Sequence, residues 1–312
     1  METMKKIYTG HAVDVLTTLP DDSIDSCVTS PPYFGLRDYG MSRQIGLEKS
    51  PEEYIQSLAS VFKQVYRVLK PSGTLWLNIG DSYAGSGRGK GDVNRNRIQS
   101  KASFVGDTFD KPYRIAGCKN KDLIGIPWAV AFALREIGWY LRQEIIWHKP
   151  NPMPESVRDR CTKSHESIFL MAKNIRYYFD HQAIMEPAKY DGRKNQTHKP
   201  SQKYLQNNTG APVQTISKCG GERWRVINGQ FVKNKRDVWT VPTRPFKGAH
   251  FATFPPDLIK PCILAGCPPD GTVLDPFFGA GTTGIVAKQL ARNFIGIELN
   301  PAYVKIATER LA

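Results

Sequence analysis

Hydrophobic and polar positions alternate along the chain with two different periods. Short apolar runs bounded by turn residues predict strands at 26–29 (SCVT), 74–79 (TLWLNI), 139–147 and 166–172. Apolar residues at helical spacing predict helices at 51–69 and 126–137. Pro51 opens the first of these helices, and Lys70-Pro71-Ser72-Gly73 stops it. Alternating strands and helices are typical of an α/β protein.

The carboxyl-terminal part of the chain has the most regular pattern. A strand at 271–275 (GTVLD), a glycine-rich turn, a helix at 282–291, a strand at 293–298 (NFIGIE) and a helix at 301–311 follow one another. This order predicts a complete βαβ unit, in which both strands are parallel.

Charge and composition narrow the choice of partner. The 312 residues carry a formal net charge of +14, which favours a polyanionic partner, with nucleic acid first and a merely basic, solvated surface as the alternative. No apolar run is long enough to span a bilayer, so we expect a cytosolic protein with no membrane partner. Six scattered cysteines without a CxxC pair predict reduced thiols and no metal site.

Two segments interrupt the regular pattern. Residues 82–121 are rich in Gly, Lys, Arg and Asn and predict a mobile basic loop, either a solvated linker or an arm that contacts DNA. Residues 181–240 interleave basic residues with aromatic ones, which suits phosphate contacts and base stacking, although surface loops have similar compositions. We interpret 181–240 as an inserted recognition region.

The turn DPFFGAGTTG carries a candidate cofactor site. Gly279, Gly281 and Gly284 stand in GxGxxG spacing between a strand and a helix, where small residues let the backbone approach a ligand. Glu298 ends the next strand, where its carboxylate can accept hydrogen bonds from both ribose hydroxyls of an adenosine group. Dinucleotides and S-adenosylmethionine both present such a ribose, so this feature alone leaves a dehydrogenase and a methyltransferase open.

The start of the same turn favours a cationic cofactor without phosphate. Asp275 is an acid where a dinucleotide-binding loop keeps small residues near the pyrophosphate. We expect Asp275 to face the methionine end or the sulfonium of S-adenosylmethionine and Phe277 to pack beside it.

Thr29-Ser30-Pro31-Pro32-Tyr33 carries the candidate chemistry. Two prolines after a strand keep nearby carbonyls out of regular structure, so the Ser30 hydroxyl and the Pro31 carbonyl can accept hydrogen bonds from an exocyclic amino group. Tyr33 would stack on a base flipped out of the duplex. The simpler interpretation is a turn stiffened by prolines.

The motifs TSPPY, DPFFGAGTTG, NFIGIELNP and HFATFP (His250 to Pro255) together resemble those of the amino-methylating DNA methyltransferases. With TSPPY near the amino terminus and the glycine turn near the carboxyl terminus, their order resembles the permuted beta group. The serine form of the first motif is similar to the cytosine-N4 enzymes, whereas adenine-N6 enzymes usually carry Asp or Asn at that position. The resemblance implies catalytic Ser30, Pro31, Pro32 and Tyr33, and cofactor-binding Phe254, Pro255, Asp275, Phe277, Gly279, Gly281, Thr282 and Glu298.

The same resemblance implies an architecture and partners. We expect a Rossmann-like class I methyltransferase fold, with a mostly parallel seven-stranded sheet, an antiparallel edge hairpin and the amino-terminal segment beside the carboxyl-terminal unit. Residues 1–180 would form the catalytic part of one domain, 181–240 the target-recognition region and 241–312 the cofactor-binding part. The expected partner is double-stranded DNA with a flipped base, and a homodimer and a cognate restriction endonuclease are both compatible with the family.

Other functions account for less of the sequence. An adenine-N6 enzyme is the nearest alternative, because it differs mainly at Ser30. A carbon-5 cytosine methyltransferase needs a Pro-Cys nucleophile, but Pro261-Cys262 lies in an apolar helical stretch and predicts a core cysteine. Zinc deaminase motifs are absent, and a DNA-binding module leaves the glycine turn unexplained. For His148, Lys149, His165 and Glu166 we favour strand capping or phosphate contacts over acid–base catalysis.

Overall fold

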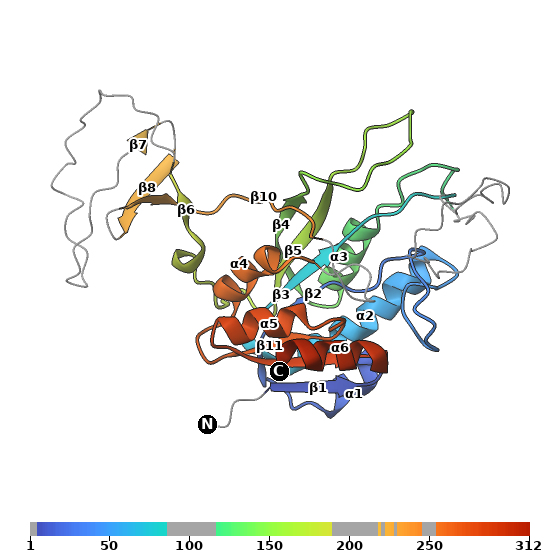
Figure 1. Ribbon diagram of the computed structural model, residues 1–312, viewed down its shortest axis with the longest axis horizontal. Coiled ribbons are helices and arrows are strands. Elements are labelled where there is room, and N and C mark those ends of the chain that lie inside the picture. Colours follow the sequence, from blue (N-terminus) through green and yellow to red (C-terminus); the bar gives the residue numbers. More distant parts are fainter. Residues whose placement is uncertain (1–4, 86–116, 189–217, 220–221, 228–229, 245–253) are drawn as a thin grey trace.

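The structure is a computed structural model that describes residues 5–85, 117–188, 218–219, 222–227, 230–244 and 254–312. Most of the expected basic loop over 82–121, much of the expected recognition region over 181–240, and residues 250–253 therefore lie outside the described residues. The described part is built around one large sheet with helices on both faces (Figure 1).

The large sheet consists of eight strands within the described residues. In spatial order they are β1 (Lys5–Thr9), β12 (Asn293–Glu298), β11 (Thr272–Asp275), β2 (Ile24–Thr29), β3 (Leu69–Ile79), β5 (His165–Ala172), β4 (Tyr140–His148) and β10 (Val238–Thr240). All neighbours are parallel except at β5, which is antiparallel to both β3 and β4. The mostly parallel α/β fold is confirmed.

Two expectations about this sheet need correction. It has eight described strands and not seven, because the short β10 pairs with β4 beyond the β4–β5 hairpin. The antiparallel hairpin therefore does not form the edge of the sheet. β10 comes from the segment that we interpret as a recognition region, so the end of that segment contributes to the main sheet.

The two ends of the chain meet in the sheet, as the permuted motif order implies. β1 pairs in parallel with β12, with Lys5 opposite Phe294 and Thr9 opposite Glu298. The first strand therefore extends the carboxyl-terminal βαβ unit, and that prediction is confirmed.

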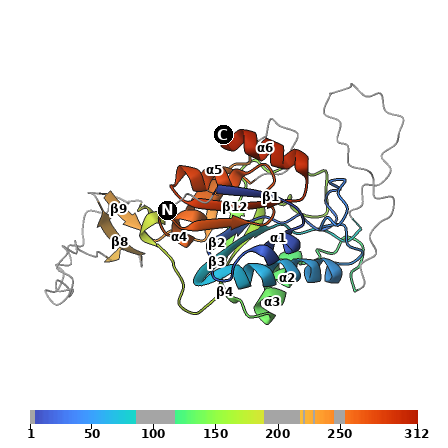
Figure 2. The same ribbon diagram turned by 90° about the horizontal axis from the view of Figure 1, so that it is seen from below.

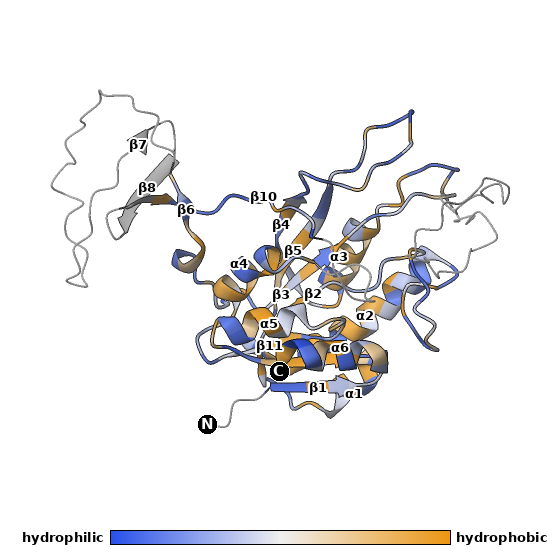
Figure 3. Cartoon of the chain, viewed as in Figure 1, coloured by the Kyte–Doolittle hydropathy of each residue, from blue (hydrophilic) through white to orange (hydrophobic). Residues whose placement is uncertain are grey.

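Helices cover the sheet in two layers, seen edge-on in Figure 2. One layer consists of α1 (Ala12–Thr18), α2 (Pro51–Val68) and α3 (Ile126–Glu136), and the other of α4 (Pro256–Gly266), α5 (Thr282–Gln289) and α6 (Pro301–Leu311). Alternate strand residues serve the two layers: Leu75 and Leu77 join the first core, and Trp76 joins the second. The central strands β2 and β11 are buried along their full length because both faces are covered, whereas the edge strand β1 begins with the exposed Lys5 and Lys6, blue in Figure 3.

Helix α2 begins where the sequence predicts and ends slightly earlier. The Ser50 hydroxyl accepts a hydrogen bond from the Glu53 backbone N–H at 3.2 Å, and Pro51 occupies the first turn. The helix ends at Val68, and the Lys-Pro-Ser-Gly segment expected to stop it lies inside β3. None of the described helices combines the length and apolar character that a membrane crossing requires.

A second, smaller sheet lies within the proposed recognition region. Its strands are β6 (Glu186–Pro187), β9 (Gln230–Lys233), β8 (Glu222–Ile227) and β7 (Lys218–Cys219), all antiparallel, and a short 3-10 helix η1 (Gln182–Ile184) precedes them. This sheet projects to one side of the main body in Figure 1. Glu186 pairs with Arg236 at 2.7 Å and with Lys233 at 3.8 Å, which ties the segment after β9 to β6.

Candidate active site

The candidate site residues gather at one edge of the main sheet. The parallel strands β2, β3, β11 and β12 all end at this edge, and the antiparallel β5 begins there. Thr29, Asp275 and Glu298 are the last residues of three of these strands. Open α/β sheets bind ligands outside the carboxyl ends of their strands, because the connecting loops there leave a crevice.

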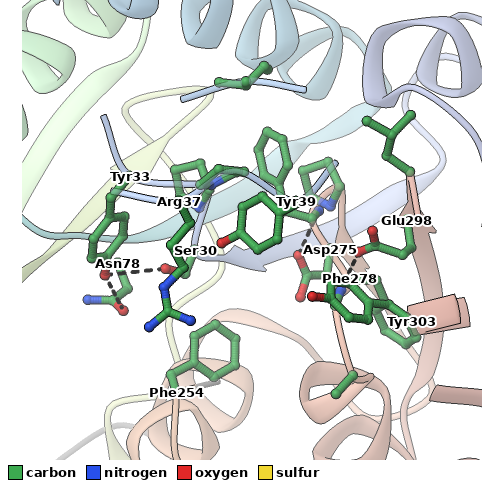
Figure 4. Close-up of a pocket in the computed structure, with 18 of the residues that line it drawn as sticks. Ser30, Tyr33, Arg37, Tyr39, Asn78, Phe254, Asp275, Phe278, Glu298 and Tyr303 are labelled. Carbon is green, nitrogen blue, oxygen red and sulfur yellow. Dashed lines mark hydrogen bonds between the residues drawn. The ribbon is translucent and has the colours of Figure 1, made fainter. Parts of the chain in front are cut away.

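A cavity of about 860 Å³ opens at this edge (Figure 4). Among its lining residues are all the expected site residues except Gly281 and Pro255, namely Ser30, Pro31, Pro32, Tyr33, Phe254, Asp275, Phe277, Gly279, Thr282 and Glu298. Its volume is in the range of small-molecule sites. The proline motif and the glycine turn, which are far apart in the sequence, therefore line the same cavity.

The cavity has two sides: Figure 4 shows Ser30, Tyr33 and Asn78 opposite Asp275 and Glu298, with Phe254 below them. We call the side formed by the turn Asp275–Thr282 and Glu298 the glycine side. The proline side is formed by residues 30–33 together with Asn78, Lys149 and Glu166.

Asp275 connects the two sides. Its carboxylate accepts hydrogen bonds from the hydroxyls of Thr29 and Thr283, each at 2.6 Å, and from the backbone N–H of Phe277 at 3.0 Å. The residue is 2% exposed, and burial raises its pKa to about 6 although these hydrogen bonds act in the opposite direction. Asp275 thereby joins the end of β2 to β11 and α5. Its contact with a sulfonium stays a prediction.

Glu298 holds the glycine turn through its carboxylate. One oxygen accepts the backbone N–H of Gly279 at 2.7 Å, and the other accepts the N–H of Asn300 at 2.8 Å. Burial raises the pKa of Glu298, while the two backbone N–H groups lower it. Each carboxylate oxygen has a second lone pair, so the side chain can still accept bonds from ribose hydroxyls in the cavity.

The remaining glycines of the turn serve packing. A Cβ on Gly284 would lie 2.7 Å from the buried ring of Phe278, and one on Gly281 would lie 3.0 Å from Ala307 of α6. Gly281, which we expected to contact the cofactor, therefore packs against α6 and does not line the cavity. Pro255, the other expected contact outside the lining, precedes α4 as its N-cap residue.

The proline motif keeps two acceptors at the cavity. The Pro32 carbonyl accepts the hydroxyl of the buried Tyr54 at 2.8 Å, which anchors the motif to α2. No residue in the described ranges donates to the Pro31 carbonyl, and the Ser30 hydroxyl contacts the Tyr33 hydroxyl at a long 3.4 Å. Ser30 and Pro31 both line the cavity, and their contact with an amino group stays a prediction.

Tyr33 is fixed by residues from other strands. Its hydroxyl donates to Glu166 Oε2 at 2.6 Å and lies 3.4 Å from Asn78 Oδ1. Burial, followed by the nearby Glu166 carboxylate, raises the pKa of Tyr33, so its hydroxyl stays protonated and remains a donor. The ring needs the space at Gly80, where a Cβ would lie 2.6 Å from it.

Sequence reasoning missed Asn78 and did not place Lys149 and Glu166 in the cavity. Asn78 lies near the end of β3, Glu166 near the start of β5, and Lys149 directly after β4, where it forms an ion pair with Glu166. Lys149 and Glu166, for which we favoured strand capping or phosphate contacts, both line the cavity. The sequence signal for these residues was their position at strand ends, on the edge of the sheet where the cavity opens.

Two tyrosines also line the cavity without having been predicted. Tyr39 and Tyr303 meet edge to face, with ring centroids 6.3 Å apart. They come from the loop after the proline motif and from the first turn of α6, so aromatic surface connects the two sides.

Other sequence predictions concern cysteines and metals. Cys262 is 1% exposed in the core of the α4 layer, and burial raises the pKa of its thiol, so its assignment as a core cysteine is confirmed. In the described part of the chain, no group of His, Cys, Asp or Glu side chains is arranged to hold a metal ion.

Comparisons with known sequences identify relatives along nearly the whole chain. Residues 24–309 match the DNA methylase family N6_N4_Mtase. The type II methyltransferase M.Cfr9I of Citrobacter freundii is 46% identical over 305 residues, covering 98% of this chain and 87% of that protein. M.SmaI of Serratia marcescens is 45% identical over 309 residues, covering 98% and 90%.

Solved structures share the fold at lower sequence identity. The PvuII DNA methyltransferase, which is cytosine-N4-specific, superimposes with a TM-score of 0.64 at 18% identity, over 99% of this chain and 87% of that one. M1.HpyAVI in complex with SAM superimposes with a TM-score of 0.53 at 18% identity, over 99% and 100%. With the family match and near end-to-end relatives added to this shared fold, the chain belongs to the N6/N4 family of DNA methylases.

Proposed function

We propose that the enzyme transfers a methyl group from S-adenosyl-L-methionine to the exocyclic N4 amino nitrogen of cytosine in DNA. The observation that carries this proposal is the shared cavity, in which Ser30 and Pro31 face the same space as Gly279 and Glu298. A methyl donor and an amino group must lie side by side for direct transfer, and one cavity between the two motifs allows this.

The glycine side fits the adenosine and methionine parts of the cofactor. Glu298 would accept the ribose hydroxyls, while Phe254 and Phe277 would pack against apolar parts of the cofactor. Asp275 would contribute negative charge near the sulfonium through its buried carboxylate. When bound, S-adenosyl-L-methionine supplies a methyl group on a positively charged sulfur, which an uncharged nitrogen can attack directly.

The proline side fits an amino group on a base. The Ser30 hydroxyl and the Pro31 carbonyl would each accept one N–H of the amino group, which directs the nitrogen lone pair toward the glycine side. Pro32 fixes the backbone of this turn, and Tyr33 would pack against the base. As the N–C bond forms and the S–C bond breaks, the surplus proton of the amino group leaves to water.

The target base has to leave the duplex to enter this cavity, at a cost of a few kcal/mol. Contacts in the cavity and with the DNA backbone would offset that cost. The net charge of +14 supports such backbone contacts, and we assign sequence recognition to residues 181–240. The likeness to type II methyltransferases supports a cytoplasmic role in protecting DNA from a restriction endonuclease.

Cytosine is favoured over adenine by two observations. Ser30 precedes the two prolines of the motif, and this serine form resembles the motif of the cytosine-N4 enzymes. The PvuII enzyme, which shares the fold, is cytosine-N4-specific. An adenine-N6 enzyme is the second candidate, because both bases offer an amino group of similar geometry.

Mass spectrometry of nucleosides tests the reaction directly. DNA lacking modification is incubated with the enzyme and isotopically labelled S-adenosyl-L-methionine, then digested to nucleosides, with the Ser30→Ala enzyme as the matched control. We expect labelled N4-methylcytosine. Labelled N6-methyladenine would replace the proposal by the second candidate, and 5-methylcytosine or the absence of label would overturn both.

A further inference from the structure

A buried charged pair on the proline side has no part in the function proposed above. Lys149 and Glu166 form an ion pair inside the cavity, with side chains only 18% and 14% exposed. Removing two charges from water is costly, and a buried pair is a poor stabiliser compared with apolar side chains. Its place in the cavity therefore suggests a ligand contact.

The Glu166 carboxylate is held on several sides. Its Oε2 accepts the Tyr33 hydroxyl at 2.6 Å and the Asn78 amide at 3.1 Å, while Oε1 accepts the Lys149 ammonium. A carboxylate with these partners is fixed in position. It is therefore suited to orienting Lys149 more than to moving a proton.

The ammonium of Lys149 keeps donors for a ligand. An ammonium has three N–H groups, and in the described part of the chain only Glu166 accepts one of them. The ammonium also lies 4.4 Å from the centroid of the Trp147 ring, which supports it from one side. The other donors are available to a carbonyl oxygen in the cavity.

We propose that Lys149, oriented by Glu166, donates a hydrogen bond to the O2 carbonyl of the flipped cytosine and so selects cytosine over adenine. This inference rests on the proposed function. Contacts lead along one wall from Ser30 to Tyr33 at 3.4 Å, from Tyr33 to Glu166 at 2.6 Å, and on to Lys149. A base whose amino group lies at Ser30 would thus turn the rest of its hydrogen-bonding edge toward Lys149.

The chemistry of the two bases explains the selection. Next to its amino group, cytosine presents a ring nitrogen and then a carbonyl oxygen, both acceptors. Adenine presents the amino group, a ring nitrogen and then a C–H. An adenine would leave the largely buried Lys149 without a second acceptor, and enzymes reject substrates strongly on that ground.

A thermodynamic cycle that combines one change in the protein with one change in the base tests the contact. The value of kcat/KM is measured for the wild type and for Lys149→Met on duplexes whose single target is cytosine or 2-thiocytosine, a weaker acceptor at position 2. We expect Lys149→Met to lose about 10- to 100-fold on cytosine, the usual effect of removing a hydrogen bond to a charged group. It should then show no further loss on 2-thiocytosine, whereas the wild type should lose activity on the analogue. If 2-thiocytosine lowers kcat/KM by the same factor in Lys149→Met as in the wild type, the two changes are independent and the contact is overturned.

Controls separate this inference from folding and from the proposed function. Lys70 also pairs with a carboxylate, that of Asp25, but outside the cavity, so the two kcat/KM values of Lys70→Met should equal those of the wild type. Affinity for the cofactor, measured by calorimetry, should change less than twofold in Lys149→Met. If that variant fails to fold, the wild type alone decides: equal kcat/KM on cytosine and 2-thiocytosine, both placed opposite a mismatch, would overturn the contact.

The base preference gives a last readout. The ratio of kcat/KM for cytosine over adenine at the target position should fall at least tenfold in Lys149→Met, and an unchanged ratio would overturn the role in selection. Formation of N6-methyladenine by the wild type on natural DNA would instead overturn the proposed function itself. The two failures are therefore distinguishable.

Discussion

The glycine side and the proline side of the cavity take their residues from the chain in different ways. The glycine side is nearly continuous in sequence, and the Gly279 N–H bonded to Glu298 shapes it together with close packing around Phe278. The proline side gathers side chains from the ends of separate strands, and hydrogen bonds among these side chains hold it. Changes on the glycine side should therefore act on folding and cofactor affinity, and changes on the proline side on turnover.

The strongest test of this comparison is Ser30→Ala on the proline side. The change removes one acceptor for the amino group without altering the backbone of the motif, so kcat should fall about 100- to 1,000-fold, as when one stabilising hydrogen-bonding group is removed from an active site. The dissociation constant of S-adenosyl-L-methionine should stay within about twofold. Steady-state kinetics and calorimetry measure the two quantities.

Ser60→Ala is the matched control for that change. Ser60 lies on the exposed face of α2 and bonds only its own helix, at Gln56, so neither quantity should change. Equal losses of turnover and cofactor affinity in Ser30→Ala would contradict the division between the two sides.

The pH dependence of stability tests Asp275, which links the sides. Its pKa is about 6 in the folded protein against an ordinary 3.8, so the folded state binds more protons than the unfolded state between these values. The free energy of unfolding should therefore fall as pH rises through this window, by about 3 kcal/mol from this group. Denaturant unfolding of the wild type and of Asp275→Asn from pH 4 to pH 7.5 measures the difference between them.

An aspartate whose pKa is lowered, not raised, controls for general charge effects. The hydrogen bond from Lys121 lowers the pKa of the exposed Asp159, so Asp159→Asn should change the pH dependence weakly and in the opposite direction. If the difference in the free energy of unfolding between wild type and Asp275→Asn does not change with pH, burial does not raise the pKa of Asp275.

Periodicity predicted the local part of this molecule well. The strand at 293–298 and the helix at 301–311 have the predicted bounds, because each has an apolar pattern closed by clear turn or capping residues such as Asn300. β3 begins before its predicted start, because Leu69 already pairs with Ile24 of β2, and the Lys-Pro-Ser-Gly segment forms an irregularity before pairing resumes at Thr74. β10 has only three residues and depends on its pairing with β4.

Partners distant in sequence explain what sequence reasoning missed. The spacing of the glycines was found, but their purpose depends on Phe278 and Ala307, which no spacing reveals. Lys149 and Glu166 are separated by a hairpin, and Asn78 meets Glu166 only because β3 pairs with β5. A single sequence carries the signal of a strand end but not the identity of its neighbour.

Gly296→Ala should expose the packing that builds the glycine side. A Cβ at this position would lie 2.4 Å from the ring of Phe278, which is 3% exposed and stacks on Phe294. Overpacking of this kind should reduce the free energy of unfolding by about 2 kcal/mol. Denaturant unfolding measures the loss, and adding Phe278→Leu should restore part of it. A double variant less stable than both single variants would contradict the proposed clash.

Glu298→Gln should give the smallest effect and separate affinity from turnover. The change keeps the size of the side chain but replaces one acceptor oxygen by a donor, so the ribose and the N–H groups of Gly279 and Asn300 compete for the remaining oxygen. The dissociation constant of S-adenosyl-L-methionine should rise about tenfold, or about 1.4 kcal/mol, while kcat at saturation falls less than threefold. Calorimetry measures the first and kinetics the second, with the exposed Glu309→Gln on α6 as the matched control. If kcat falls more than affinity, Glu298 acts on the reacting atoms, and the glycine side is not a binding surface alone.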